Sequence, residues 1–114
     1  MKRDPELIKK ILEAYEAIEI PGADSWLDIQ GYTDEAIYYH NQLLADEKLV
    51  EGKFSRTHDQ SYTIIPYRLT NKGHDLLDIA RKDSLWEKAK PFIEKGIIEL
   101  ADIAKTVALG KLLQ

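Results

Sequence analysis

The side chains best suited to catalysis or metal binding are scattered along this sequence. The histidines His40, His58 and His74 never stand four residues apart on one helix, and no cysteine completes a metal site. The acidic pair Asp34-Glu35 is adjacent, so its carboxylates point to different sides of a helix. A glycine-rich phosphate loop and a nucleophile elbow are both missing from the sequence. We therefore predict a protein that is not an enzyme, with no metal or cofactor, and expect His40 to be a hydrogen-bonded core side chain.

Contact with a macromolecular partner is the chemistry that the sequence favours instead. On a helix that begins after Thr33, the side chains expected to point outward are Tyr38, Tyr39 and Gln42. A basic group follows along the chain and consists of Lys53, Arg56, His58, Arg68 and Lys72. Basic side chains contact phosphates, whereas tyrosine is enriched at protein interfaces. Two simpler interpretations stay open: one tyrosine packs inward, and the basic residues belong to a solvated hairpin loop.

The charge distribution weighs against DNA. The chain of 114 residues has a net charge of −4 and a pI near 5.4. Residues 1–50 carry 5 basic and 11 acidic side chains, a net charge of −6, whereas residues 51–83 carry a net charge of +1. Affinity for DNA comes largely from neutralisation of phosphates, and an acidic surface is repelled by them. The helix that would contact DNA lies in the acidic half of the chain.

Length and composition predict one soluble domain with its own hydrophobic core. The charged residues at the N-terminus do not resemble a signal peptide, and charges interrupt every apolar run that approaches the length of a membrane span. We expect an intracellular, cytoplasmic protein without membrane contact. Within the domain we expect a core over residues 1–83 and a helical extension over residues 84–114, packed on the core or on a second chain.

A helix and a β-hairpin must position the predicted contact residues. Thr33 is the expected N-cap of the helix, because Asp34 and Glu35 follow in its first turn. A strand begins at Leu49-Val50, and after the polar loop SRTHDQ the chain returns as the strand YTIIPYRL, which is rich in β-branched and aromatic residues. Thr70 is the expected N-cap of the next helix.

The elements before this hairpin complete the expected fold. Asp4-Pro5-Glu6 predicts the start of a first helix over about residues 5–19. Ser25–Gln30 alternates apolar and polar residues, which favours a short strand over a single helical turn. As the third strand of an antiparallel sheet it would stabilise the hairpin. One core is expected to contain Leu7, Ile11, Leu12, Leu43, Leu44, Leu49, Ile65, Leu69 and Leu77.

The C-terminal part predicts two further helices. Ser84 is the expected N-cap of the first, Pro91 predicts a kink or a break in it, and Gly96 marks a joint. The last helix, Ile97–Leu113, is apolar on nearly two sides, so it is either sandwiched in the core or paired with another chain. We expect a homodimer through this helix. The alternative is that the helix from Ser84 folds back over its exposed side.

Two stretches resemble winged helix-turn-helix regulators of bacteria. The first is IYYHNQLL followed by EKLV, which is similar to the reading helix and strand entry of that superfamily, and the second is the junction YRLTNKG. Nearly the whole chain also resembles an uncharacterised family of small proteins from bacteria and prophages, which shares the MKRD opening, the YH helix and the RLTxxGH junction. The resemblance implies an α+β winged helix with a three-stranded antiparallel sheet and additional C-terminal helices.

The sequence departs from the regulators at three places. Lys48 stands where they usually carry a glycine in left-handed conformation, which for lysine costs roughly 1 kcal/mol, so a different helix end is equally expected. Asn41 stands where an apolar residue is common, which indicates a rotated helix or a less buried position. Between Pro21 and Thr33 there is no room for both a strand and the usual first helix of the motif.

Three functions are compatible with these observations. A DNA-binding regulator is placed narrowly first, because the resemblance covers the motif itself and double-stranded DNA is the partner that it implies. A protein-interaction module on the same fold is second, favoured by the acidic first half and the apolar last helix. An enzyme is a distant third. A continuous positive face around Tyr38, Tyr39 and the hairpin would favour DNA, and a neutral or negative one would favour a protein partner.

Overall fold

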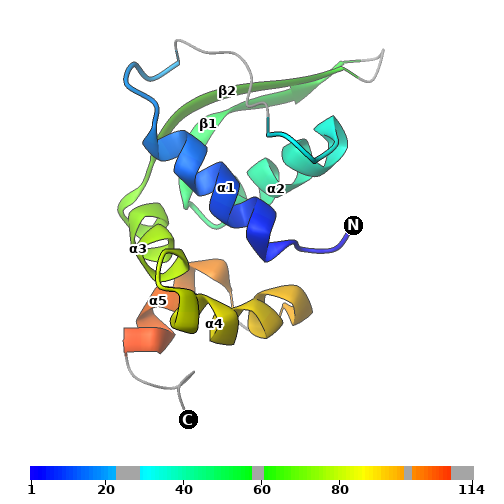
Figure 1. The fold of residues 1–114 in the computed structure, drawn as a ribbon. Coiled ribbons are helices and arrows are strands. Elements are labelled where there is room, and N and C mark those ends of the chain that lie inside the picture. Colours follow the sequence, from blue (N-terminus) through cyan, green and yellow to red (C-terminus); the bar gives the residue numbers. More distant parts are fainter. Residues whose placement is uncertain (23–28, 58–60, 97–98, 109–114) are drawn as a thin grey trace.

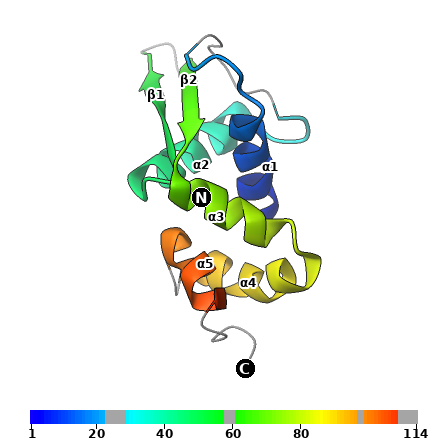
Figure 2. The same cartoon turned by 90° about the vertical axis from the view of Figure 1, so that its left-hand side faces the viewer.

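The fold places one β-hairpin against the two helices that precede it and the helix that follows it (Figure 1). The computed structural model describes residues 1–22, 29–57, 61–96 and 99–108. Its elements follow in the order α1 (Pro5–Glu16), α2 (Asp34–Asp46), β1 (Val50–Arg56), β2 (Tyr62–Leu69), α3 (Asn71–Ala80), α4 (Asp83–Lys95) and α5 (Leu100–Ala108). The chain is therefore an α+β protein. Both ribbon views show α4 and α5 at the end of the molecule away from the hairpin tip (Figures 1 and 2).

Three helices begin where the capping residues predict. The Asp4 carboxylate accepts hydrogen bonds from the backbone N–H groups of Glu6 and Leu7, at 3.0 and 3.3 Å. The Thr33 hydroxyl accepts one from Ala36 N–H at 3.1 Å, and Thr70 caps α3 in the same way. Such caps satisfy N–H groups that have no partner within the helix. The predicted starts of α1, α2 and α3 are thus confirmed, whereas α1 ends at Glu16, three residues early.

The two strands form an antiparallel pair with one bulge. Val50 pairs with Leu69 and Glu51 with Arg68, but Gly52 then pairs with Pro66, so Tyr67 is the extra residue. The expected third strand falls mostly on residues 23–28, which lie outside the described part, and Ile29 and Gln30 are not in a strand. The described sheet has two strands. Gly22 N–H donates to the Pro66 carbonyl of β2 at 3.2 Å.

The hydrophobic core joins the hairpin to all five described helices. Its fully buried side chains include Leu7, Ile8, Ile11, Leu12, Ile37, Leu44, Leu49, Ile64, Leu76 and Leu77. Two predictions about the core are wrong: Leu43 is only half-buried, and Ile64 is buried in place of Ile65. The bulge explains the second error. Regular alternation back from Leu69 points Ile65 inward, but the extra residue Tyr67 reverses the facing of the preceding part of β2.

The C-terminal helices differ in detail from the prediction. α4 begins at Asp83 with Lys82 as its N-cap residue, so Ser84 is not the cap, and the helix runs through Pro91 without a break. Gly96, with a φ of 67°, ends α4 as predicted. Leu100 and Ile103 of α5 are buried. Residues 97–98 and 109–114 lie outside the described part, so the dimer expected through Ile97–Leu113 stays a prediction.

Lys48 ends α2 in the left-handed conformation, with a φ of 62°. The backbone N–H of Leu49 donates to the Leu44 carbonyl and that of Lys48 to the Ala45 carbonyl, both at 2.9 Å. This is a Schellman motif, in which the residue at the position of Lys48 is usually glycine. The usual helix end is therefore retained although the usual residue is not.

Replacing Lys48 with Gly is expected to raise the free energy of unfolding by about 0.5–1 kcal/mol, because glycine has no Cβ to oppose a positive φ. Urea denaturation followed by circular dichroism measures the change. Lys48→Ala is the matched control, since it removes the exposed amine but keeps the Cβ. A control that stabilises the protein as much as Lys48→Gly would assign the effect to charge instead of backbone strain.

Candidate interaction surface on α2 and the hairpin

An aromatic contact joins the outer side of α2 to the hairpin. Glu35, Tyr38 and Gln42 lie three and four residues apart, so the helix presents them on one side. The ring of Tyr38 packs on that of Tyr62 in β2, with centroids 4.7 Å apart and planes tilted by 38°. Gln42 Nε2 donates to the Tyr38 hydroxyl at 3.3 Å. Together with Arg56 of β1, these four residues form what we call the α2–hairpin face.

A hydrogen bond and a cation–π contact hold the Tyr62 ring in place on the hairpin side of this face. The Tyr62 hydroxyl donates to Glu35 Oε1 at 3.2 Å, and the guanidinium carbon of Arg56 lies 5.5 Å from the Tyr62 ring centroid. Desolvation, and to a lesser extent the Glu35 carboxylate, raise the pKa of Tyr62 against the opposing effect of Arg56. Tyr62 therefore stays a hydrogen-bond donor at neutral pH.

The structure brings together only part of the predicted contact set. Tyr38, Gln42 and Arg56 belong to the α2–hairpin face, whereas Tyr39 packs its ring edge-on against His40, with centroids 5.2 Å apart. Both tyrosines are half-buried. Tyr62 and Glu35 also belong to this face, although neither is among the residues expected from the sequence to make contacts. The signal for Tyr62 was its place in the strand YTIIPYRL, but its ring contact depends on how the hairpin packs on α2.

The remaining basic candidates lie elsewhere. Lys53 is three residues before Arg56 on β1, so it faces the opposite side of the hairpin. Arg68 is on that side too and is held by Glu51, with an Nη2–Oε1 distance of 2.8 Å. Lys72 is exposed in the first turn of α3. His58 lies outside the described residues. The predicted basic group is thus divided between separate surfaces.

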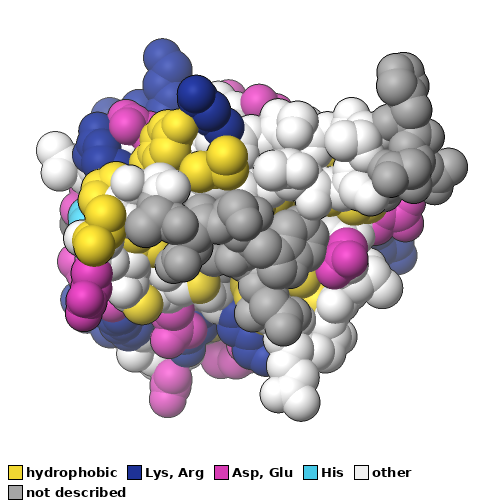
Figure 3. Space-filling view, turned by 90° about the horizontal axis from the view of Figure 1, so that it is seen from above, with side chains coloured by type: hydrophobic (Ala, Val, Ile, Leu, Met, Phe, Trp, Pro, Cys, Tyr) yellow, Lys and Arg dark blue, Asp and Glu magenta, His cyan; other side chains and the backbone are white. Residues whose placement is uncertain are grey.

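The exposed side of α2 is acidic. Asp34, Glu35, Gln42 and Asp46 are its exposed residues, and the helix contains no lysine or arginine. On the molecular face seen in Figure 3, basic side chains lie among acidic ones, without an extended positive area. Among the described residues of α2 and the hairpin, Arg56 is the one basic residue on the side of the hairpin that faces α2. The described side chains on this side of α2 and the hairpin therefore carry more negative than positive formal charge.

Behind this surface, α2 carries two buried polar side chains. Asn41 is fully buried, which corrects the expectation of a rotated helix or a less buried position. Its Oδ1 accepts a hydrogen bond of 2.6 Å from the Tyr15 hydroxyl of α1, and its Nδ2 donates to the Ile37 carbonyl at 2.8 Å. Burial raises the pKa of Tyr15 well above its ordinary value. His40 is 1% exposed and hydrogen-bonded, as predicted.

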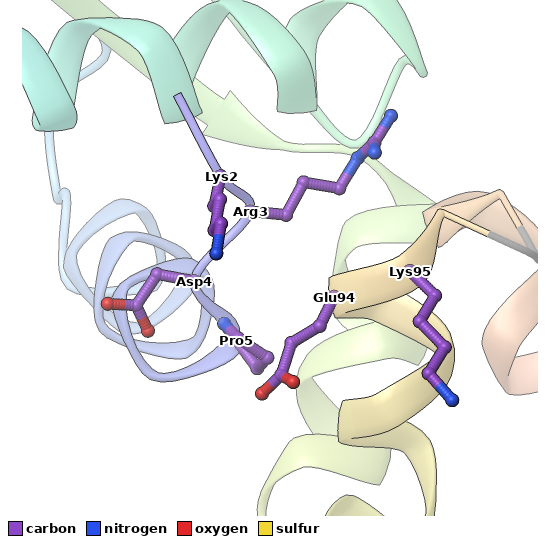
Figure 4. A pocket seen from close by; sticks show the side chains of 6 residues that line it. All are labelled: Lys2, Arg3, Asp4, Pro5, Glu94 and Lys95. Carbon is purple, nitrogen blue, oxygen red and sulfur yellow. The ribbon is translucent and has the colours of Figure 1, made fainter.

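A hollow of about 590 Å³ lies away from this surface, between the N-terminal segment and the end of α4, and is lined by Lys2, Arg3, Asp4, Pro5, Glu94 and Lys95. In Figure 4 the charged ends of these side chains point in different directions. Among the described residues, no group of three or more His, Asp or Glu is arranged to hold a metal ion. None of the described helices is both long and apolar enough to cross a membrane.

Fold and surface together define a small α+β protein that presents an acidic helix beside a β-hairpin. The chain belongs to the DUF2513 family, because the family model described as "Hypothetical protein (DUF2513)" matches residues 2–99. An uncharacterized protein of Haemophilus influenzae (strain ATCC 51907 / DSM 11121 / KW20 / Rd) is 34% identical over 111 residues, which cover 95% of this chain and 92% of that relative. No solved structure matches the chain significantly. The expected membership of an uncharacterised family is thereby confirmed.

Proposed function

We propose that this protein is a non-catalytic protein-interaction module on a winged-helix-like fold, and that its α2–hairpin face receives a basic segment of a partner protein. The order α2, β1, β2, α3 supports the winged-helix assignment, because the hairpin takes the place of a wing between two helices. Fold alone does not decide what the module binds. The observation that carries the proposal is the exposed side of α2, which has three carboxylates and no cation.

Electrostatics favours a protein partner over DNA. If α2 entered the major groove, Asp34, Glu35 and Asp46 would approach a dense array of phosphates, and Arg56 alone would compensate them on that side. A lysine- or arginine-rich segment is attracted by the same carboxylates. The packed rings of Tyr38 and Tyr62 add a preformed contact area that loses little side-chain entropy on binding.

DNA binding is the second candidate, and Arg56 and Lys53 are the observations that favour it. Both are exposed on β1, near the loop that a winged helix uses as its wing. If this function holds, Arg56→Ala and Lys53→Ala each weaken binding uniformly across sequences and lower the salt slope by about one unit. Homodimerisation, the division at residue 83 and the cytoplasmic location stay predictions that accompany either function.

The test compares two probes by fluorescence anisotropy at physiological salt. A labelled arginine-rich peptide is expected to bind the protein, and a labelled DNA duplex of about 20 base pairs is expected to bind more weakly than a Kd of about 10⁻⁴ M, the weak limit of ordinary non-specific binding. Glu35→Lys is expected to weaken peptide binding about tenfold, since it reverses a charge on the face.

Asp78→Lys is the matched control for this experiment. It makes the same change of net charge on an exposed position of α3, away from the α2–hairpin face. If Glu35→Lys and Asp78→Lys weaken peptide binding equally, the affinity depends only on the net charge of the protein, and the proposed surface is rejected. Micromolar, salt-dependent binding to the duplex that Arg56→Ala reduces would establish the DNA-binding candidate in its place.

A further inference from the structure

The segment Met1–Asp4 contacts two helices that are distant in sequence before it enters α1. The backbone N–H of Asp4 donates to His40 Nε2 of α2 at 2.9 Å. Arg3 reaches the end of α4, where its Nη1 lies 2.7 Å from the position that a Cβ on Gly96 would occupy. In Figure 4 the Arg3 side chain extends away from Lys2 and Asp4. The segment therefore connects α2 to the C-terminal helices.

Arg3 also acts on the group that holds the start of α5. Glu47, just after α2, accepts a hydrogen bond from the Ala101 N–H at 3.2 Å. A hollow of about 480 Å³ beside this contact is lined by Arg3, Leu43, Asp46, Glu47, Lys48, Lys72, Glu99, Ala101 and Asp102. Burial raises the pKa of Glu47 and the neighbouring Glu99 raises it further, whereas the backbone N–H groups and Arg3 oppose these effects. Arg3 thus helps to keep the carboxylate of Glu47 charged.

The bond between Asp4 and His40 requires a neutral imidazole. His40 Nδ1 lies 2.8 Å from the Ala36 carbonyl, an acceptor, so Nδ1 carries the proton. Nε2 faces the Asp4 N–H, which can only donate, so Nε2 must offer its lone pair. A proton on Nε2 would place two donors against each other inside the core, where an unpaired charge is costly.

We propose that Met1–Asp4 is a strap that holds the α4–α5 unit to α2, and that protonation of His40 releases it. Release moves Arg3 away from Gly96 and Glu47, and the Glu47 carboxylate then faces Glu99 without this cation. The hydrogen bond from Ala101 N–H weakens in consequence. One proton on α2 is in this way transmitted to the start of α5 through the backbone of Asp4 and the side chain of Arg3.

The sign of the pH dependence follows from the surroundings of His40. Burial lowers its pKa below the ordinary value of 6.5, opposed in part by the Ala36 carbonyl and the Asp4 carboxylate. Among the described residues, Asp4 is the charged group that acts on His40, and the Tyr39 ring packs against its edge. The strap is therefore fully held above pH 6.5 and is released as the pH falls through the lower pKa of the folded state.

Two-dimensional NMR of the full chain tests this proposal by titration from about pH 8 to about pH 4.5, a range that spans the histidine transition. The imidazole signal of His40 and the amide signals of Asp4 and Gly96 are expected to share one midpoint below 6.5, while the amide of Leu77 in the core stays unchanged. His40→Gln removes the titrating group and abolishes the shared transition. His74→Gln on α3 is the matched control and leaves it unchanged.

Arg3→Ala provides a second test if His40→Gln does not fold, because Arg3 lies outside the core and its replacement is expected to leave the fold intact. In this variant the Asp4 amide still titrates with His40, but the Gly96 amide loses its response. The proposal is overturned if the Gly96 amide titrates with His40 without Arg3, if its midpoint differs from that of His40 in the natural sequence, or if Leu77 shifts with it, since that indicates global unfolding.

Discussion

Replacing Leu44 with Ala is expected to lower the free energy of unfolding by about 2–5 kcal/mol, the range for a buried leucine that leaves a cavity. Leu44 is fully buried in α2 and belongs to the core that joins α1, the hairpin and α3. Its carbonyl also accepts the Leu49 N–H that closes the helix end, and the two buried side chains flank that turn. Urea denaturation measured by circular dichroism gives the change.

Leu43 supplies a matched control for this prediction. Leu43→Ala removes the same atoms from the adjacent position, but Leu43 is only half-buried and packs at the edge of the core. Less apolar surface returns to water and no closed cavity forms, so the expected loss is less than half as large, on the order of 1 kcal/mol. If Leu43→Ala is the more destabilising change, the orientation of α2 is wrong, and the α2–hairpin face is wrong with it.

Local signals in the sequence predict the elements well. The caps Asp4, Thr33 and Thr70 act within three residues of their own position, and the return strand Tyr62–Leu69 matches its composition boundary. Errors arise where packing between elements determines which side chains are buried. Regular alternation along the strand would place Ile65 in the core, whereas the bulge opposite Glu51 and Gly52, which buries Ile64 instead, depends on pairing with another strand.

The candidate site shows the same limit. Helical spacing places Gln42 on the exposed side of α2 and Tyr38 partly so, but it does not reveal that Tyr62 packs on Tyr38 or that Lys53 and Arg68 face the other side of the hairpin. These facts depend on how the hairpin lies against α2. The burial of Asn41 also depends on packing between elements, because it is made favourable by the Tyr15 hydroxyl, a partner 26 residues away in the chain.

Replacing Gly73 with Ala is expected to lower the free energy of unfolding by about 2–5 kcal/mol, although two effects of the change oppose each other. Gly73 is in the first turn of α3, and in a helix alanine is favoured over glycine by about 1 kcal/mol. A Cβ at this position would lie 2.1 Å from the backbone carbonyl oxygen of Leu49 and 3.0 Å from a methyl group of Leu69. Backbone atoms must move to relieve this overlap.

The movement disrupts more than packing, which is why the clash outweighs the helix propensity. The Leu49 carbonyl accepts the backbone N–H of Thr70 at 3.1 Å. The Thr70 hydroxyl, which caps α3 by accepting from Gly73 N–H, lies 2.6 Å from the Lys48 carbonyl and 3.1 Å from that of Leu49. Overpacking costs about 1–3 kcal/mol, and each weakened hydrogen bond adds about 0.5–1.5 kcal/mol. Lys72→Ala introduces the same side chain one residue earlier at an exposed position, so a change within about 0.5 kcal/mol is expected there. The midpoints of urea denaturation of both variants distinguish the two effects. If Gly73→Ala stabilises the protein by the difference in helix propensity between alanine and glycine, α3 does not approach the start of β1 as closely as the structure places it.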